Sequence, residues 1–217
     1  SSSYRPTPTI IEAAEALFSG HSVKEITRSE AGAINLEKTA AAALRVINDA
    51  KKNQKKSLIF LTGVPGSGKT LAGLEIATAS RRESHSDNEG DFLTGNGPLA
   101  DVLREALARD EVQRNGISKT DAMRKAKTFI QNIHHFRDNY LVDKKPPYEK
   151  VVVFDEAQRA WDRQATSRFM IQKRGMEGFD QSEPEFLLSV MARHADWCVV
   201  VCLIGNGQEI NSGEAGV

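Results

Sequence analysis

The sequence predicts a doubly wound α/β fold, a mostly parallel sheet with helices on both of its faces. Two observations lead to this prediction. Short apolar runs at residues 57–62, 151–154 and 196–204 alternate with stretches of helical periodicity, as they do in parallel sheets covered by helices. The first run leads directly into a glycine-rich turn and a helix, a strand-turn-helix unit typical of this fold class.

The elements follow in order along the chain. Apolar residues recur at helical spacing over 9–19, and Ser22 with Glu25 fits a capping box for a short helix. Asn35 is the predicted N-cap of an alanine-rich helix that ends near residue 52. The run 57–62 is expected to be a strand buried on both faces of the sheet, followed by a helix over 69–81. Residues 1–56 are therefore predicted to be a helical N-terminal segment packed on a core domain of residues 57–217.

Weaker strands are expected at 92–94 and 128–133, because these runs are short and less apolar. Helices are expected at 99–109, 119–127 (a basic helix) and 136–141. A last helix is expected over 184–194, with Ser182 and Glu185 as its capping box.

Composition limits the classes of function. The 217 residues contain 29 Lys and Arg and 29 Asp and Glu, which argues against a uniformly basic coat but not against a local basic groove. The longest apolar run, 197–204, is far shorter than the roughly 18 residues of a membrane span. Cys198 and Cys202 lie at even spacing on one predicted strand and are expected in the core. With no secretory signal and no disulfide framework, a cytoplasmic protein without a membrane partner is expected, and both ends look like cuts in a longer chain.

Residues 63–70, Gly-Val-Pro-Gly-Ser-Gly-Lys-Thr, fit the P-loop pattern G-x-x-x-x-G-K-[ST]. Glycines allow backbone N–H groups to point at phosphate oxygens, and the helix that follows directs its positive end at the same anion. Lys69 is expected to reach the β- and γ-phosphates of ATP and Thr70 to ligate Mg²⁺. The predicted nucleotide-binding residues of the loop are Gly63, Val64, Pro65, Gly66, Ser67, Gly68, Lys69, Thr70 and Leu71.

The second apolar strand ends in two carboxylates, Asp155 and Glu156. A strand end of this type is expected to place Asp155 beside the P-loop, where it holds Mg²⁺ through water. Glu156 is then the expected catalytic residue that polarises the attacking water. Together with the P-loop, this pair predicts an ATPase.

Several segments resemble the motifs of superfamily 1 helicases. Residues 155–158, Asp-Glu-Ala-Gln, are similar to motif II, which implies that Gln158 contacts the nucleotide. Residues 205–209 resemble motif III, which implies a catalytic contact of Gln208 with the γ-phosphate, although Asn206 stands where an Asp is common. Segment 130–136 is similar to motif Ib, which contacts single-stranded nucleic acid, and segment 92–99 falls where motif Ia should be. The positions that carry this contact are expected to be Thr94, Asn96, His134 and His135.

As a whole, the chain resembles the Schlafen-like DNA/RNA helicase-type ATPases. The resemblance rests on GVPGSGKT, LTGNGPLADVLREALARD, QNIHHFRD, VVVFDEAQRAWDR, SEPEFL and LIGNGQEINSGEAG. It implies a RecA-like first domain of a helicase or translocase that acts on DNA or RNA. It also implies a second RecA-like domain downstream and a nuclease-like module upstream in the parent chain. Because the second domain supplies arginines to the γ-phosphate, the isolated segment is expected to hydrolyse ATP slowly.

Two other functions fit the same motifs. An oligomeric AAA-type ATPase would use Asn206 as a polar sensor and leave Gln208 incidental. A regulatory module would hold ATP without useful turnover and signal to an attached domain. The pair Gln158 and Gln208 favours the helicase interpretation.

Overall fold

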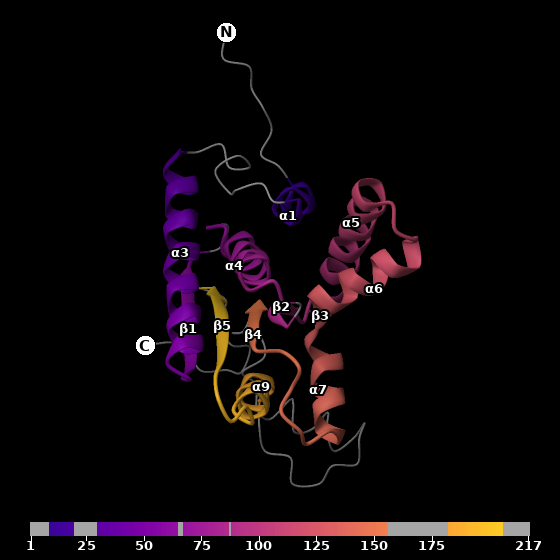
Figure 1. The fold of residues 1–217 in the computed structure, drawn as a ribbon. Coiled ribbons are helices and arrows are strands. Elements are labelled where there is room, and N and C mark those ends of the chain that lie inside the picture. Colours follow the sequence, from indigo (N-terminus) through magenta and orange to yellow (C-terminus); the bar gives the residue numbers. More distant parts are fainter. Residues whose placement is uncertain (1–8, 20–29, 65–66, 87, 156–181, 206–217) are drawn as a thin grey trace, which may run out of the picture.

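The computed structural model describes residues 9–19, 30–64, 67–86, 88–155 and 182–205. In this part of the chain, five strands form one parallel sheet in the order β1-β5-β4-β2-β3 (Figure 1). The strands are β1 (Lys56–Gly63), β2 (Glu89–Thr94), β3 (Ile130–Asn132), β4 (Val151–Asp155) and β5 (Cys198–Gly205). The predicted α/β fold class is confirmed, and β5 lies between β1 and β4 although it comes last in the chain.

Helices cover both faces of the sheet (Figure 1). The first cluster of buried side chains joins one face to α1, α3, α4, α5 and α6, and the second joins the opposite face to α7 and α9. Alternate residues of β4 enter different clusters, Val151 and Val153 the first and Val152 and Phe154 the second. The helices are α1 (Ile10–Phe18), α3 (Glu30–Lys52), α4 (Lys69–Ser84), α5 (Gly97–Asn115), α6 (Lys119–Phe129), α7 (Ile133–Val142) and α9 (Glu183–Met191).

The prediction that the first strand is buried on both faces is wrong. Along β1 the residues alternate between exposed and half-buried, and Leu58 and Phe60 are 42% and 49% exposed. The reason is position, because β1 is an edge strand that pairs with β5 alone. Among the described residues, its side chains therefore meet a helix layer on one face only. An apolar run shows that its residues favour a buried strand, but it does not show whether the strand lies at the centre or at the edge of the sheet.

Several helix boundaries also differ from the prediction, and the largest differences are at the start of α3 and the end of α5. Helix α3 begins at Glu30, so Asn35 lies inside it and its carbonyl accepts a hydrogen bond from the hydroxyl of Thr39 at 2.7 Å. Helix α5 extends to Asn115 and ends at Gly116, whose φ of 64° is left-handed. A cap signal shows where a helix can start, but residues 30–34 contain nothing that stops the helix from starting earlier. The capping box predicted at Ser22 lies outside the described residues.

Other local predictions are confirmed. Ser182 caps α9 with a capping box in which its hydroxyl accepts from the N–H of Glu185, whose side chain accepts from the N–H of Ser182. Cys198 and Cys202 are both buried on the face covered by α9, and burial raises the pKa of the Cys202 thiol to about 12. Each helix in the described part of the chain is too short or too polar to traverse a lipid bilayer.

Strand β2 contains a glycine that no other residue can replace without strain. Gly90 has a φ of 124°, and a Cβ there would lie 2.1 Å from the carbonyl oxygen of Ala77 in α4. The pairing of β2 with β4 shifts register at this point, between Glu89 and Asp91. The glycine therefore allows α4 to lie directly against an irregular strand start.

We predict that Gly90→Ala destabilises the fold by about 2–4 kcal/mol, because it adds both backbone strain and a steric overlap. For a chain of this length, the midpoint of thermal unfolding should fall by about 5–15 °C. Gly97→Ala is the matched control, since no atom lies within 4 Å of a Cβ at Gly97 in the first turn of α5. Circular dichroism during heating measures both, and equal midpoints for the two variants would contradict the prediction.

Candidate functional site

The residues predicted to bind nucleotide lie at the carboxyl edge of the sheet. The register pairs Gly63 at the end of β1 with Gly205 at the end of β5. On the other side of β5, β4 ends at Asp155, which pairs with Thr94 at the end of β2. Strand β5 therefore separates the P-loop from Asp155, and only side chains that reach across its end can join them.

The described part of the P-loop is a turn that opens directly into a helix. Gly68 has a left-handed φ of 81° and is the N-cap of α4, which begins at Lys69. The backbone N–H of Ser67 donates to the carbonyl of Val64 at 3.2 Å, and a Cβ at Gly63 would lie 2.6 Å from the hydroxyl oxygen of Ser67. A side chain at position 63 would therefore require the hydroxyl of Ser67 to move. Helix α4 begins directly at the end of the turn, and the positive end of a helix favours an anion.

The ammonium group of Lys69 folds back over its own loop. Its Nζ donates to the carbonyl oxygens of Gly63 at 2.6 Å and Val64 at 2.8 Å, and lies 3.4 Å from Oγ of Ser67. These oxygen acceptors hold the cation at the centre of the turn. Phosphate oxygens arriving at that point would meet the same cation.

Thr70 and Asp155 meet across the end of β5. The hydroxyl of Thr70 lies 3.4 Å and 3.3 Å from the two carboxylate oxygens of Asp155 and donates to them. Asp155 is buried, at 4% exposure. A hydroxyl and one carboxylate, completed by phosphate oxygens and water, are the ligands that Mg²⁺ takes in nucleotide sites. The sequence separates these residues by 85 positions, and the fold brings them into contact.

A contact that the sequence did not indicate comes from the N-terminal segment. Leu36 of α3 lies so close to Gly68 that a Cβ on this glycine would stand 3.5 Å from Cδ2 of Leu36. Leu36 is half-buried and belongs to the first core cluster. Helix α3 therefore packs against the cap of the P-loop helix. No local signal identifies such a contact, because it depends on how α3 lies against α4.

Five of the predicted nucleotide residues lie outside the described residues, whereas Leu71 is partly buried against the first core cluster. The five are Pro65, Gly66, Glu156, Gln158 and Gln208. Glu156 directly follows Asp155, so its peptide begins at the end of β4. Likewise, the segment that carries Gln208 leaves from Gly205, between the ends of β1 and β4.

The four predicted nucleic-acid positions lie at the same edge, at the end of β2 or just after the ends of β2 and β3. Thr94 is fully buried and its hydroxyl oxygen accepts from the N–H of Asn96 at 3.1 Å. Asn96 caps α5 by accepting from the N–H of Leu99 at 3.1 Å. Both side chains thus shape the turn that follows β2.

His134 and His135 are exposed in the first turn of α7. Asn132 caps this helix by accepting from the N–H of His134 at 2.8 Å, and it pairs in register with Thr94. Sequence reasoning missed Asn132, although an Asn at the start of a helix is a common cap. The two turns therefore lie side by side on neighbouring strands.

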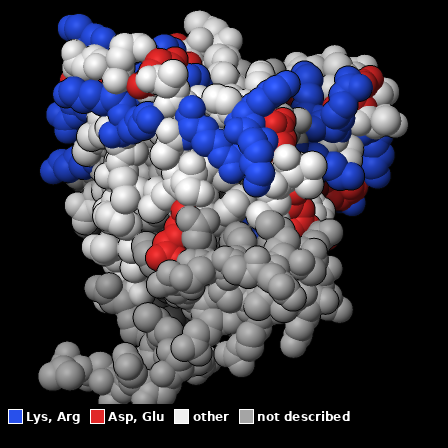
Figure 2. Space-filling model, turned by 90° about the horizontal axis from the view of Figure 1, so that it is seen from below, with Lys and Arg blue, Asp and Glu red and all other residues white. Residues whose placement is uncertain are grey.

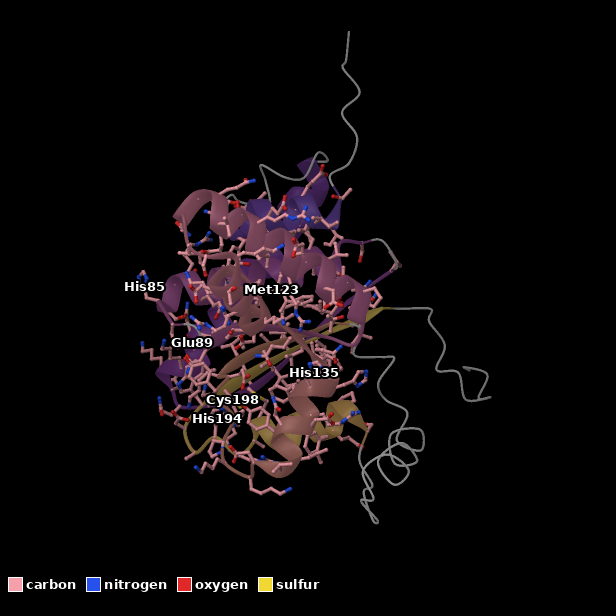
Figure 3. All side chains as sticks on the ribbon, turned by 90° about the vertical axis from the view of Figure 1, so that its right-hand side faces the viewer. His85, Glu89, Met123, His135, His194 and Cys198 are labelled. Atoms are coloured by element: carbon pink, nitrogen blue, oxygen red, sulfur yellow. The ribbon has the colours of Figure 1, made fainter. Side chains whose placement is uncertain are left out.

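Figure 3 places His135 nearer the end at which β5 terminates, with His194 and Cys198 toward the opposite end. His194 is buried, and one ring nitrogen lies 2.8 Å from the carbonyl oxygen of Glu149. Burial lowers its pKa. His194 is thus a structural histidine, whereas His135 is open to solvent at the candidate site.

The most shifted carboxyl group lies away from this edge. Asp91, in the middle of β2, is fully buried and accepts from Arg81 of α4. Burial raises the pKa of Asp91 to about 7, although the guanidinium of Arg81 opposes this shift. This pair joins the last turns of α4 to the sheet, so we assign it a structural role.

The described part of the surface carries basic side chains close to one another (Figure 2). The whole sequence has equal numbers of acidic and basic residues, 29 of each. On the face seen in Figure 2, lysine and arginine side chains of the described residues lie close to one another, with a few acidic side chains between them. Zero net charge therefore does not prevent local basic surfaces, as the composition already implied.

Comparison with known proteins agrees with this geometry. Residues 56–217 match the sequence model of the Schlafen group 3 DNA/RNA helicase domain. A comparison with curated proteins found no match. Since the matched residues make up most of the chain and include every strand of the sheet, the chain belongs to the Schlafen group 3 DNA/RNA helicase domain family.

Proposed function

We propose that this helicase-type domain binds MgATP at the P-loop and hydrolyses it in response to nucleic acid, as a helicase or translocase does. The contact of Thr70 with Asp155 across the end of β5 supports this proposal best. It brings a hydroxyl and a carboxylate oxygen to one point beside the N-terminus of α4. A Ser or Thr hydroxyl and an Asp carboxylate are the protein ligands that hold Mg²⁺ beside the phosphates in P-loop sites.

In this proposal each residue has a separate role. The N–H groups of the turn and the ammonium group of Lys69 bind the β- and γ-phosphates. In binding them, Lys69 gives up its hydrogen bonds to the carbonyl oxygens of Gly63 and Val64. Thr70 and Asp155 hold Mg²⁺, which neutralises charge on the phosphates. Glu156 orients and polarises the attacking water, and Gln158 and Gln208 contact the nucleotide near the γ-phosphate.

Nucleic acid is proposed to bind along the turns after β2 and β3. His134 and His135 supply exposed side chains there, and Thr94 and Asn96 hold the backbone of the neighbouring turn. Because Thr94 pairs with Asp155 in register, these turns begin one strand away from the proposed magnesium ligand. A conformational change in the turn after β2 can therefore be transmitted to the nucleotide site through the neighbouring end of β4.

Lys69→Ala should remove most of the affinity for MgATP, because the side-chain cation on the β- and γ-phosphates is removed. Isothermal titration calorimetry measures the change directly. Lys55→Ala is the control, since Lys55 precedes β1 at the opposite end of the sheet and its side chain is 58% exposed. An unchanged affinity in Lys69→Ala would exclude the P-loop as the nucleotide site.

Asp155→Asn should weaken the effect of magnesium on ATP binding while leaving binding of metal-free ATP nearly unchanged. The amide keeps the size of the side chain but lacks the negative charge that Mg²⁺ prefers. Calorimetric titrations with ATP in magnesium and in EDTA give the ratio of the two affinities. The same ratio in wild type and variant would contradict the role of Asp155, and the exposed Asp49→Asn serves as the control.

Glu156→Gln should retain MgATP binding and lower turnover by about 10²-fold, since the positioned base is removed. Single-turnover hydrolysis, with and without single-stranded DNA or RNA, is the appropriate assay. Stimulation of the wild type by nucleic acid supports the helicase-type proposal. Tight binding with no hydrolysis under any condition would support a regulatory nucleotide module instead.

A further inference from the structure

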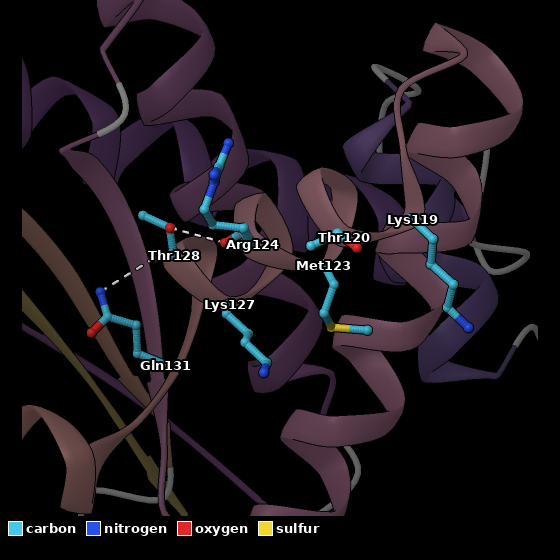
Figure 4. Close-up of a pocket in the computed structure, with 7 residues that line it drawn as sticks. All are labelled: Lys119, Thr120, Met123, Arg124, Lys127, Thr128 and Gln131. Carbon is cyan, nitrogen blue, oxygen red and sulfur yellow. Dashed lines mark hydrogen bonds between the residues drawn. The ribbon is translucent and has the colours of Figure 1, made fainter.

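An open hollow of about 820 Å³ runs along one face of α6 (Figure 4). The described residues that line it come from α6 and from the start of β3. They are Lys119, Thr120, Met123, Arg124, Lys127, Thr128 and Gln131. Their spacing of three and four residues places them on one side of the helix.

The lining has one sign of charge. Three of the lining side chains are cations, and no carboxylate is among the described residues that line the hollow. Lys119 pairs with Glu105 at 3.2 Å and Arg124 pairs with Asp121 at 2.9 Å. The side chains of Lys119 and Arg124 are nevertheless largely exposed. Exposed ion pairs of this kind are weak and exchange readily. Lys127 forms no ion pair with another residue in the described part of the chain.

The neutral residues have distinct places. Two of them already donate hydrogen bonds to other residues. The hydroxyl of Thr128 donates to the carbonyl of Arg124, and the side-chain amide of Gln131 donates to the carboxylate of Glu149. The contacts available to an anion are therefore the three cations and the hydroxyl of Thr120. Met123 adds an apolar surface between them.

The hollow adjoins the proposed nucleic-acid edge. Strand β3 is the outer strand of the sheet and pairs with β2 alone. Gln131, at the inner end of the hollow, is followed by Asn132, the cap of the helix that carries His134 and His135. A strand that passes over these histidines can continue along α6 without crossing another element of the described sheet.

The open form of the hollow favours a polymer over a small ligand. Small molecules bind in concave sites that enclose most of their surface, whereas this surface is shallow and elongated. Lys119 and Lys127 are separated by about 12 Å along the helix axis. Cations spread along such a line match a chain of phosphates, and an apolar side chain between them can contact a base.

We propose that the phosphate backbone of single-stranded nucleic acid lies along α6 and contacts Lys119, Arg124 and Lys127. This inference rests on the proposed function and extends its nucleic-acid path from the turns after β2 and β3 to the side of the domain. The helix itself supplies the matched control. Lys125 lies on another side of α6, where it pairs with Glu111 at 3.4 Å and does not line this hollow.

The test compares Arg124→Ala/Lys127→Ala with Lys125→Ala in binding of fluorescein-labelled oligo(dT) and oligo(U), measured by anisotropy at several salt concentrations. The double variant should bind at least about fivefold more weakly, and its salt slope should fall by about 0.7 for each phosphate that it no longer neutralises. Lys125→Ala should retain the affinity and the slope of the wild type. Comparing the two oligonucleotides shows whether DNA or RNA is the better ligand.

Two results would overturn the proposal. Equal affinity and slope in the wild type and the double variant would remove α6 from the path while leaving the proposed function intact. If Lys125→Ala weakened oligonucleotide binding as much as the double variant does, the loss would reflect the total positive charge of the protein and not contacts with this hollow. If the wild type bound neither oligonucleotide, the nucleic-acid part of the proposed function would fail together with this inference, whereas MgATP binding would be tested separately by Lys69→Ala.

Discussion

The packing of α4 on the sheet is the constraint on which the candidate site depends. Helix α4 lies across one face of the sheet, and its backbone approaches the strands closely at Gly73. A Cβ there would stand 2.6 Å from Leu203 of β5 and 3.0 Å from Val153 of β4. Thr70 lies three residues earlier, on the same side of the helix. Because Gly73 has no side chain, Thr70 can reach Asp155 across the end of β5.

The order of the strands explains why this contact joins two motifs that lie far apart in the sequence. Because β5 lies between β1 and β4, the loop after β1, the loop after β5 and the end of β4 follow one another along a single edge. The next strand, β2, ends beside Asp155, and β3 ends beside β2. A parallel sheet places all of these ends on the same side, which is where ligands bind in folds of this class. The nucleotide and nucleic-acid positions thus occupy neighbouring parts of one edge.

The N-terminal helices contribute to this arrangement although the family match begins only at residue 56. Helix α3 packs along α4 and brings Leu36 to Gly68, and α1 closes the core over α4 and α5. The start of α4, which follows the predicted phosphate-binding turn, is consequently packed against both the sheet and α3. A displacement of α3 would act on the cap of α4 and hence on Lys69 and Thr70.

The sequence by itself determined the fold class, the position of the P-loop and the strand that ends in Asp155. These features depend on local patterns, because a glycine-rich turn between an apolar strand and a helix specifies its own geometry. Tertiary structure decided which strand lies at the edge, so β1 exposes Leu58 and Phe60 although its composition matches that of a buried strand. It also decided that Thr94 is enclosed while His135 faces solvent, and that α3 reaches the P-loop. Such outcomes depend on which elements pack on each residue from distant parts of the chain, and periodicity along the sequence carries no information about those neighbours.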